Sequence, residues 1–433
     1  MKTTFLLLYG LLLAMVCFAQ TTSSKPNIII ILADDLGYGD LKCYNPERGK
    51  IATPQIDKLA SQSMRFTDGH SSSGVCSPSR YALLTGRYHW RTRLQAGIVD
   101  VFGAPLIAPE RMTIGTLAKQ KGYQTAAIGK WHLGWEWPIS KEQKSLLQPP
   151  KKANKDDASK PKRVPDVATE KQVEAWSGFF SKPIAAGPTT RGFNTYFGTD
   201  VPNWPPYCFI ENDHTVGVPS EFLPIADIGN NLASIQGPAL KDWKLDNILP
   251  ALAQHAEAFI ADAAKHPEPF LLYLALTAPH TPLSPIDGWK NKSGLNTYAD
   301  FVMQTDATVG RLLDVLEKSG AAGNTLVIFT SDNGGMEAHH NEVITDNYPL
   351  DKGKINAKEG GVRVPFLISG PGIPAGKESD VMVNGLDFYP TILSWTGTAK
   401  PKEQNLDGCD LSNLLAKAPQ DAGLVKEKDG SRR

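Results

Sequence analysis

The sequence has no excess of charge of either sign. Its 433 residues include 45 Lys and Arg and 45 Asp and Glu, so the formal net charge is zero. Proteins that bind nucleic acid by neutralising phosphates carry a basic excess, which this chain does not have. Apolar residues make up 41% of the chain, an ordinary value for a globular protein, and this excludes disorder along the whole length. Composition therefore predicts a folded protein that does not bind nucleic acid.

Long apolar runs are absent after residue 20. Lys2 is followed by an apolar run from Phe5 to Phe18, and the small residue Ala19 comes next. The run is shorter than the roughly 20 apolar residues that a membrane-spanning helix needs. It is typical of a secretory signal peptide, which we predict at residues 1–19 with cleavage after Ala19. We therefore expect an exported protein, periplasmic or secreted, without stable membrane insertion.

Cysteine is scarce as well, with five residues at positions 17, 43, 76, 208 and 409. Cys17 would leave with the signal peptide, and the other four would reach an oxidising compartment in which disulfides form. Two disulfides are therefore one interpretation. No Cys-x-x-Cys pair suggests a zinc site, and the sequence around Cys76 favours a chemical role for that residue instead.

Short apolar runs alternate with amphipathic segments along the chain. Runs that are apolar on both faces are typical of buried parallel strands, and the segments between them have helical period. This alternation predicts an α/β fold, a three-layer sandwich in which helices cover both faces of a large, mostly parallel central sheet. Thr53 is the predicted N-cap of the first helix. The expected strands are 27–32, 123–128, 270–276, 325–330 and 364–369, and the expected helices include 54–59, 248–264, 298–316 and 387–394.

Two of the predicted strands are followed by acidic and amide side chains. Asp34 and Asp35 follow one strand, and Asp332 and Asn333 follow another. In open α/β sheets, ligand sites form at the carboxyl ends of strands. Oxygen ligands without His or Cys select a hard cation, Ca²⁺ or Mg²⁺. Each pair taken alone is also consistent with ordinary turn chemistry, but their shared position favours a cation site.

The segment after residue 73 combines a cysteine with a short predicted helix. Ser77 is the predicted N-cap, Pro78 the first helical residue and Gly86 the residue that ends the helix. Cys76 would then lie just outside the helix N-terminus, where the dipole lowers a thiol pKa or binds an anionic group. Cys76 is therefore a candidate nucleophile and Arg80 a candidate anion clamp. The alternative is a structural cysteine beside a solvated arginine.

This segment resembles a known family. Cys76-x-Pro78-Ser79-Arg80, followed by Leu-Thr-Gly-Arg at 84–87, is similar to the signature of the formylglycine-dependent (type I) sulfatases, an arylsulfatase-like family of the alkaline phosphatase superfamily. The resemblance runs in the family's order from about residue 26 to 410. It also covers segments 33–37, 129–134, 279–282, 331–334 and 359–365.

The resemblance implies a role for each candidate site residue. It implies that a maturation enzyme oxidises Cys76 to formylglycine, whose aldehyde hydrate supplies the nucleophile. It implies one Ca²⁺, held by the four residues after the two strands: Asp34, Asp35, Asp332 and Asn333. The other matches are Arg80 and Lys130 at the nucleophile, His132 at the second hydrate hydroxyl, and His280 and Lys354 at the sulfate ester and its leaving oxygen.

The reaction that the resemblance implies is hydrolysis of a sulfate monoester. A covalent sulfoenzyme forms, and sulfate is eliminated when the second hydroxyl loses its proton. The cation, two lysines and an arginine would offset the negative charge of the ester. Export and aromatic-rich loops favour a sulfated carbohydrate, with aryl sulfates as further substrates. Two interpretations stay open: a phosphate or phosphonate ester hydrolase of the same superfamily, against which Asn333 argues, and an inactive fragment that only binds sulfated glycan.

Two further regions lie outside these motifs. Residues 141–166 are poor in apolar residues and rich in Lys and Pro. They predict a solvated insertion loop at about 138–170, with a basic lip for an anionic substrate as the alternative. Aromatic side chains in 203–207, together with Trp135, Trp137 and His214, are candidates for lining a sugar pocket.

The catalytic domain is expected to span residues 20–420. The family normally continues into a small antiparallel C-terminal domain, but residues 421–433 are a short polar tail. The expectation from this sequence is that the small domain is missing and that the tail marks a truncation point.

Overall fold

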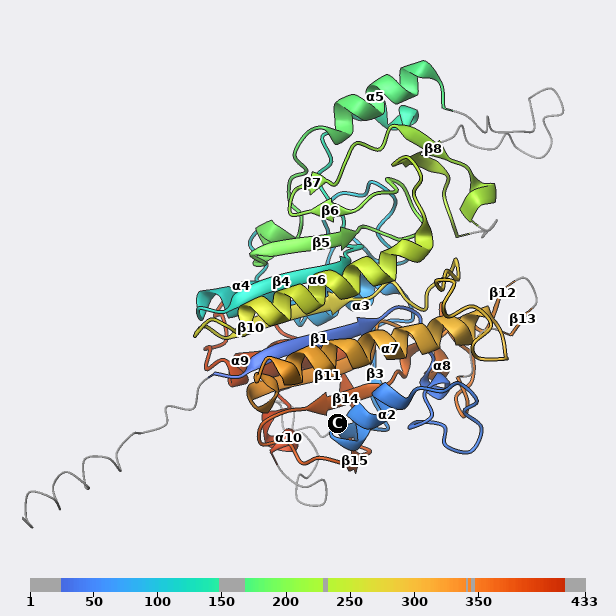
Figure 1. Cartoon of the computed structure of the whole chain (residues 1–433). Helices are drawn as coiled ribbons and strands as arrows, with labels where there is room; N and C mark the ends of the chain where they lie inside the picture. The colour runs from blue at the N-terminus through green and yellow to red at the C-terminus, as the bar shows by residue number, and fades with distance from the viewer. Residues whose placement is uncertain (1–24, 148–167, 229–232, 340–341, 344–346, 417–433) are drawn as a thin grey trace, which may run out of the picture.

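The computed structural model describes residues 25–147, 168–228, 233–339, 342–343 and 347–416 (Figure 1). The predicted signal peptide at 1–19, most of the insertion loop at 138–170 and the polar tail at 421–433 lie outside these ranges. Among the described residues, no helix combines the length and apolar character needed to cross a membrane.

A 10-stranded sheet runs through the centre of the molecule (Figure 1). Its strands are β1 (Asn27–Ala33), β2 (Met64–Phe66), β4 (Gln124–Lys130), β5 (Thr195–Thr199), β6 (Ile210–Glu211), β7 (His214–Thr215), β10 (Phe270–Ala275), β11 (Thr325–Ser331), β14 (Phe366–Ser369) and β15 (Lys377–Ser379). Their order is β15-β2-β14-β11-β1-β10-β4-β5-β6-β7. The middle strands from β11 to β5 are all parallel, whereas β14 and β6 join them antiparallel. The prediction of a mostly parallel central sheet is confirmed.

Helices cover both faces of this sheet. They are α2 (Pro54–Ser61), α3 (Cys76–Thr85), α4 (Ile114–Gln120), α5 (Glu170–Phe180), α6 (Ile248–Ala263), α7 (Thr297–Lys318), α8 (Glu359–Val362), α9 (Phe388–Trp395) and α10 (Ser412–Leu415). Ile28 and Ile30 of β1 pack into one core with α3, α4 and α9, while Ile29 and Ile31 pack into the other with α2, α6 and α7. Figure 1 shows α6 and α7 crossing one face together. The predicted three-layer sandwich is confirmed.

Small two-stranded sheets form outside the central sheet. β3 (Gly69–His70) pairs with β16 (Val383–Asn384), β8 (Glu221–Leu223) with β9 (Gly237–Ala239), and β12 (Ala338–His339) with β13 (Glu342–Val343).

The predicted strands differ from the observed ones mainly at their ends. β4 continues two residues past its predicted end and includes Gly129 and Lys130. Gly129 adopts a φ of 113°, and a Cβ at this position would lie 1.8 Å from the carbonyl oxygen of Ala275 in the neighbouring strand. The apolar pattern ends before these residues because one has no side chain and the other is charged. The strand nevertheless carries Lys130 into the buried end of the sheet.

None of the four cysteines in the described residues forms a disulfide, so the interpretation with two disulfides is wrong. The fold explains why Cys43 and Cys208 do not pair, because they pack into the two cores on opposite faces of the sheet. Cys76 is the first residue of α3, and the backbone of Cys409 donates a hydrogen bond to Asp387.

The N-terminus of α2 is capped by a residue that is distant in the sequence. Thr53 occupies the predicted N-cap position, but its side chain makes no capping hydrogen bond. The carboxylate of Asp306, in α7, instead accepts hydrogen bonds from the backbone N–H groups of Gln55 at 3.1 Å and Ile56 at 2.8 Å. This contact fixes α2 to α7 on the same face of the sheet.

We expect Asp306→Ala to lower the free energy of unfolding by about 2–4 kcal/mol, because two N–H groups lose their acceptor. Asp306→Asn keeps an acceptor oxygen and should lower it less. Burial raises the pKa of Asp306 to about 6. Protonation of Asp306 therefore stabilises the folded state. This contribution is fully present below about pH 4, the pKa of an unfolded aspartate, and is lost as the pH rises through about 6. Urea unfolding of the parent and both variants at about pH 5 and 7.5 measures both effects. Equal losses in the two variants would argue against the cap.

Candidate active site

The site lies where four neighbouring parallel strands end. β1 and β11 pair in register to their last residues, so Asp34 and Asp332 begin their loops side by side. β4 ends at Lys130, and the loop after β10 leads to His280. The backbone N–H of Asp34 donates to the carbonyl of Ala278 in that loop at 3.1 Å. Sheet topology thus gathers side chains that are far apart in the sequence, as the sequence predicts.

Asp34 is completely buried and is surrounded by basic groups. Lys130 Nζ donates to its two carboxylate oxygens at 3.0 and 2.8 Å, and Arg80 Nη2 lies 3.3 Å from Oδ1. The Cys76 thiol donates to the same Oδ1 at 3.7 Å. Burial opposes ionisation, but Lys130, His280 and Arg80 hold the pKa of Asp34 well below its usual value. Asp34 is therefore a buried carboxylate anion.

Asp35 is the second buried carboxylate. Lys354 Nζ lies 2.6 Å from Oδ2, His280 Nε2 lies 3.6 Å from the same oxygen, and the Asn333 amide donates to Oδ1 at 2.8 Å. Burial raises its pKa, yet Lys354 and His280 together lower it below the usual value. Asp35 also adopts a φ of 65°, an uncommon conformation for a residue other than glycine. Lys354 stays protonated, because Asp35 raises its pKa despite burial.

Arg80 and Asp332 form a buried ion pair. Arg80 Nε and Nη2 donate to Asp332 Oδ2 at 2.9 and 2.7 Å, and Nη1 donates to the carbonyl of Lys130 at 3.1 Å. Asp332 Oδ1 accepts from the N–H of Asp35 at 3.3 Å. Burial raises the pKa of Asp332 to about 6 even though Arg80 opposes the rise. Asp332 therefore anchors the guanidinium group, and its part in holding a metal stays a prediction.

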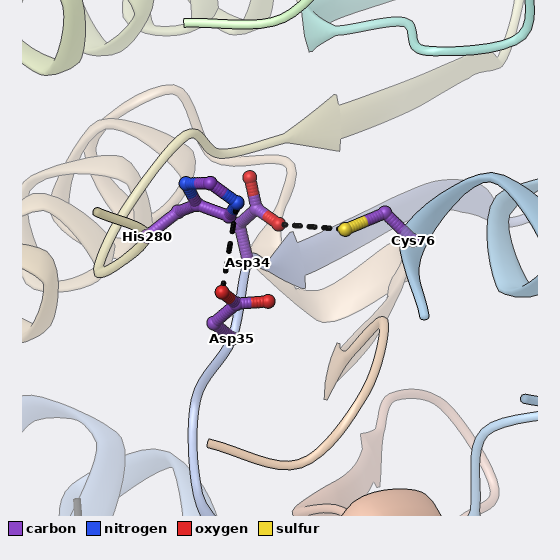
Figure 2. Close-up of side chains that lie close together, drawn as sticks. All are labelled: Asp34, Asp35, Cys76 and His280. Atoms are coloured by element: carbon purple, nitrogen blue, oxygen red, sulfur yellow. Dashed lines mark hydrogen bonds and ion pairs between the residues drawn. The ribbon is translucent and has the colours of Figure 1, made fainter. Parts of the chain in front are cut away.

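Asn333 supplies the observation that best fits a cation. Its side-chain Oδ1 is buried and has no hydrogen-bond partner, which costs free energy unless another group satisfies it. Asp34, Asp35, Cys76 and His280 offer ligand atoms that all lie within 4.8 Å of one another (Figure 2). Two ionised carboxylates beside an unpaired amide oxygen match the ligands of a hard divalent cation.

Cys76 is part of α3, which corrects the predicted helix start. The N-cap is Val75, and the hydroxyl of Ser77 accepts a hydrogen bond from the N–H of Val99 at 3.1 Å instead of capping the helix. The predicted end is confirmed, because Gly86 adopts the left-handed conformation with a φ of 61°. Cys76 therefore lies in the first turn, with only 3% of its surface exposed.

Burial controls the acidity of the thiol. The prediction that the helix dipole lowers the pKa of Cys76 is wrong. Desolvation, together with the charge of Asp332, raises the pKa of Cys76 to about 12. The residue is a neutral thiol at pH 7, which is a poor nucleophile.

His132 presents an unpaired ring nitrogen. Nε2 lies 3.2 Å from the carbonyl of Val99, and because a carbonyl only accepts, Nε2 carries the proton. Nδ1 is buried without a partner. Burial and the charges of Lys130 and Arg80 hold the pKa of His132 well below its usual value, so the ring is neutral. Its Nδ1 lone pair is thus available to accept a proton.

The loop after β5 positions this histidine. Asp200 accepts from the N–H of His132 at 3.1 Å, and the Trp204 ring packs edge-on against the imidazole with centroids 5.3 Å apart. Sequence reasoning missed Asp200, because it follows the strand without a recognisable motif.

In His280 the nitrogen that faces the carboxylate of Asp35 is Nε2, whereas in His132 the unpaired nitrogen is Nδ1. Nδ1 donates to the carbonyl of Thr281, which leaves Nε2 as the acceptor facing Asp35 (Figure 2). Burial and the neighbouring Lys354 lower the pKa of His280 to about 4, so this ring is also neutral at pH 7.

Most of the aromatic residues suggested as a sugar pocket belong to the core. Trp135 and Trp137 are 1% and 8% exposed and pack against each other, and Tyr207 is 1% exposed. His214 is exposed and pairs with Asp213 at 2.7 Å. Trp204 packs against the predicted site residue His132. Trp135, Trp137 and Tyr207 were misassigned because an aromatic cluster in sequence indicates a core as readily as a binding surface.

Comparison with known proteins decides the family. A family model described as Sulfatase matches residues 26–398. The chain belongs to the sulfatase family. It is 30% identical over 412 residues to N-acetylgalactosamine-6-O-sulfatase of Bacteroides thetaiotaomicron, an alignment that covers 91% of this chain and 77% of that protein. It is 31% identical over 420 residues to human arylsulfatase A, with coverage of 94% and 70%.

Solved structures agree with this assignment. A structure from work on the metabolism of multiple glycosaminoglycans by Bacteroides thetaiotaomicron superposes with a TM-score of 0.72 at 26% identity, over 92% of this chain and 83% of that one. This sulfatase is therefore a sulfuric ester hydrolase. Sulfatases generally use formylglycine and a divalent metal, and the buried group around Cys76 is compatible with both.

Proposed function

We propose that this sulfatase hydrolyses sulfate monoesters of carbohydrates, with aryl sulfates as further substrates, through a formylglycine made from Cys76. The observation that carries the proposal is the buried contact between Cys76 and Asp34, inside the group that also contains Asp35 and His280. The proposed ligands of one Ca²⁺ are Asp34, Asp35, Asp332 and Asn333.

The nucleophile in this proposal is a hydroxyl of the formylglycine hydrate. An unmodified Cys76, with a pKa of about 12, would stay protonated. When bound, Ca²⁺ would supply electrostatic stabilisation of the ester oxygens and of an ionised hydroxyl. Arg80 and Lys130, both completely buried beside Asp34, add positive charge at the point of attack. The hydroxyl oxygen attacks sulfur, and the bond from sulfur to the alcohol oxygen breaks.

The two histidines carry out the two proton transfers of the reaction, His280 as the acid and His132 as the base. The negative charge of a bound ester favours protonation of His280, which then gives the proton to the departing alcohol with Lys354 beside it. His132 Nδ1 takes the proton of the second hydroxyl. The bond between the formylglycine carbon and the sulfated oxygen then breaks, sulfate leaves and the aldehyde re-forms. A serine or cysteine has no second hydroxyl and could not complete this step.

The carbohydrate part of the proposal rests on relatives. One is named an N-acetylgalactosamine-6-O-sulfatase, and a solved relative at 28% identity with a TM-score of 0.63 was crystallised with k-i-k-neocarrahexaose. Export to the periplasm or the medium, directed by residues 1–19, and a maturation enzyme that oxidises Cys76 belong to the same proposal.

Turnover of matched aryl esters tests the proposed reaction. The chain, co-produced with a formylglycine-generating enzyme and supplied with Ca²⁺, is expected to hydrolyse 4-nitrophenyl sulfate faster than 4-nitrophenyl phosphate by about two orders of magnitude or more. A preference for the phosphate would contradict the proposal.

His132→Ala is expected to separate the two halves of the reaction. Without the base for elimination, the alcohol should appear in a burst of one equivalent per active site, and kcat should fall by about 10²–10⁴-fold. Rapid-quench measurement of the alcohol detects the burst. His214→Ala, at an exposed histidine paired with Asp213, is the control and should behave like the parent. A His132→Ala protein with unchanged kcat would exclude this base.

A further inference from the structure

A cavity that contains none of the residues of the sulfate site has Pro282, two residues after His280, in its wall. Its volume is about 620 Å³, in the range of cavities that hold small ligands. Its walls come from β8, the end of β9, residues 242–246 and residues 282–285. In Figure 1 the β5 arrow points toward the side of the molecule where β8 lies.

The chain connects this cavity directly to the catalytic centre. Pro282, in its wall, follows His280 by only two residues, so their Cα atoms are at most about 7 Å apart. The imidazole Nε2 of His280 lies 3.6 Å from Asp35 Oδ2 in the catalytic site. A substrate whose sulfate lies at Asp35 and whose alcohol lies at His280 would extend toward this cavity.

The charges of the two sites have opposite sign. The sulfate site contains the buried cations Arg80, Lys130 and Lys354. The wall of the cavity carries four carboxylates and two ammonium groups: Glu221, Asp227, Asp242, Asp246, Lys244 and Lys290. Lys290 forms an ion pair with Asp287 at 2.7 Å, so its positive charge is partly neutralised and attracts an anion in the cavity less strongly. A second anionic group would be repelled here, whereas carboxylate oxygens readily accept hydrogen bonds from hydroxyls.

The wall also contains an aromatic ring suited to a sugar face. Trp243 is half-buried and held edge-on by Phe209 with centroids 5.0 Å apart. The apolar face of this ring is a surface on which a sugar ring can stack, while the carboxylates of the wall can accept hydrogen bonds from its hydroxyls.

We propose that this cavity binds an uncharged hexose next to the sulfated unit, so that the enzyme selects sulfated glycans with neutral neighbours over those with uronate neighbours. This inference rests on the proposed sulfatase function, because the sugar unit that would enter the cavity is the neighbour of the unit whose sulfate ester lies in the catalytic site.

Three substrates test the selectivity: one sulfated hexose alone, the same hexose joined to glucose, and the same hexose joined to glucuronate. The glucose disaccharide is expected to have the highest kcat/KM, about tenfold above the glucuronate disaccharide. Glu221→Lys combined with Asp227→Lys changes two exposed side chains of the wall and should reverse the preference. Asp262→Lys with Glu317→Lys, two exposed side chains outside the cavity, is the matched control and should keep the parent's ratio. Trp243→Ala should reduce the advantage of the glucose disaccharide over the monosaccharide.

The outcomes separate this inference from the proposed function. Turnover of 4-nitrophenyl sulfate with equal kcat/KM for the two disaccharides, or with the same ratio in the parent and the Glu221→Lys, Asp227→Lys protein, would overturn the neutral-sugar site and leave the sulfatase intact. Failure of the matured protein to hydrolyse any of the sulfate esters, the aryl ester included, would overturn both.

Discussion

Cys76→Ala is expected to abolish steady-state hydrolysis of sulfate esters, with kcat/KM at least about 10⁴-fold below that of the matured parent. The variant loses the side chain that becomes the nucleophile, while Arg80, Lys130 and the carboxylates keep their contacts with one another. Alanine fills less space than cysteine at this buried position, but the thiol contributes only a long hydrogen bond of 3.7 Å to Asp34, so the fold should persist. Hydrolysis of 4-nitrophenyl sulfate, with circular dichroism as a check of folding, measures the effect.

Two further variants sharpen this test. Cys76→Ser supplies one hydroxyl but no second one, so it is expected to release at most one equivalent of alcohol and to remain sulfated. Cys409→Ala removes a cysteine that lies outside the site and forms no disulfide, and it should leave turnover unchanged. Repeated turnover by Cys76→Ser at the parent's rate would show that the second hydroxyl is not needed.

Asp35→Asn is expected to weaken calcium binding by at least about 100-fold and to reduce activity correspondingly. The substitution keeps the shape of the side chain but removes its charge, and it leaves the buried ammonium of Lys354 without its anionic partner at 2.6 Å. Calorimetric titration of the metal-free protein with Ca²⁺ measures binding independently of activity. Asp213→Asn, at an exposed carboxylate, is the control.

Removal of the metal tests the same claim without a substitution. Treatment with a calcium chelator should abolish turnover, and added Ca²⁺ should restore it. Full activity in protein shown to be free of divalent metal would contradict the proposed cation. Parent-like calcium affinity in Asp35→Asn would remove Asp35 from its ligands.

The strands that build the site are readable from sequence because they are apolar on both faces. β1 and β11 are buried between two helical layers, so their runs of Ile, Val and Phe stand out, and the polar residues that follow mark the carboxyl edge of the sheet. The position of Asp34 and Asp332 at one edge of the sheet could be predicted from the two strands, whereas the pairing of β1 with β11 is seen only in the structure. The contact of Cys76 with these residues follows only from the family resemblance, since α3 is not part of the sheet.

Other features depend on tertiary contacts that a local pattern does not contain. The cap of α2 comes from Asp306, 250 residues away from Ile56. Ser77 has the composition of an N-cap, but Val99 donates to its hydroxyl. The pKa of the Cys76 thiol follows from burial, which outweighs the helix dipole that the sequence suggests. Trp135 and Trp137 are core residues because their neighbours in space, unknown from sequence, are other aromatic rings.

Mass spectrometry of the tryptic peptide 66–80 from the purified, active protein shows whether Cys76 is converted to formylglycine. Residue 76 is expected to have the mass of an aldehyde rather than a thiol, in a fraction that rises in proportion to specific activity across preparations with more or less maturation enzyme. A preparation with full sulfate ester hydrolysis in which Cys76 is an intact thiol throughout would contradict this expectation.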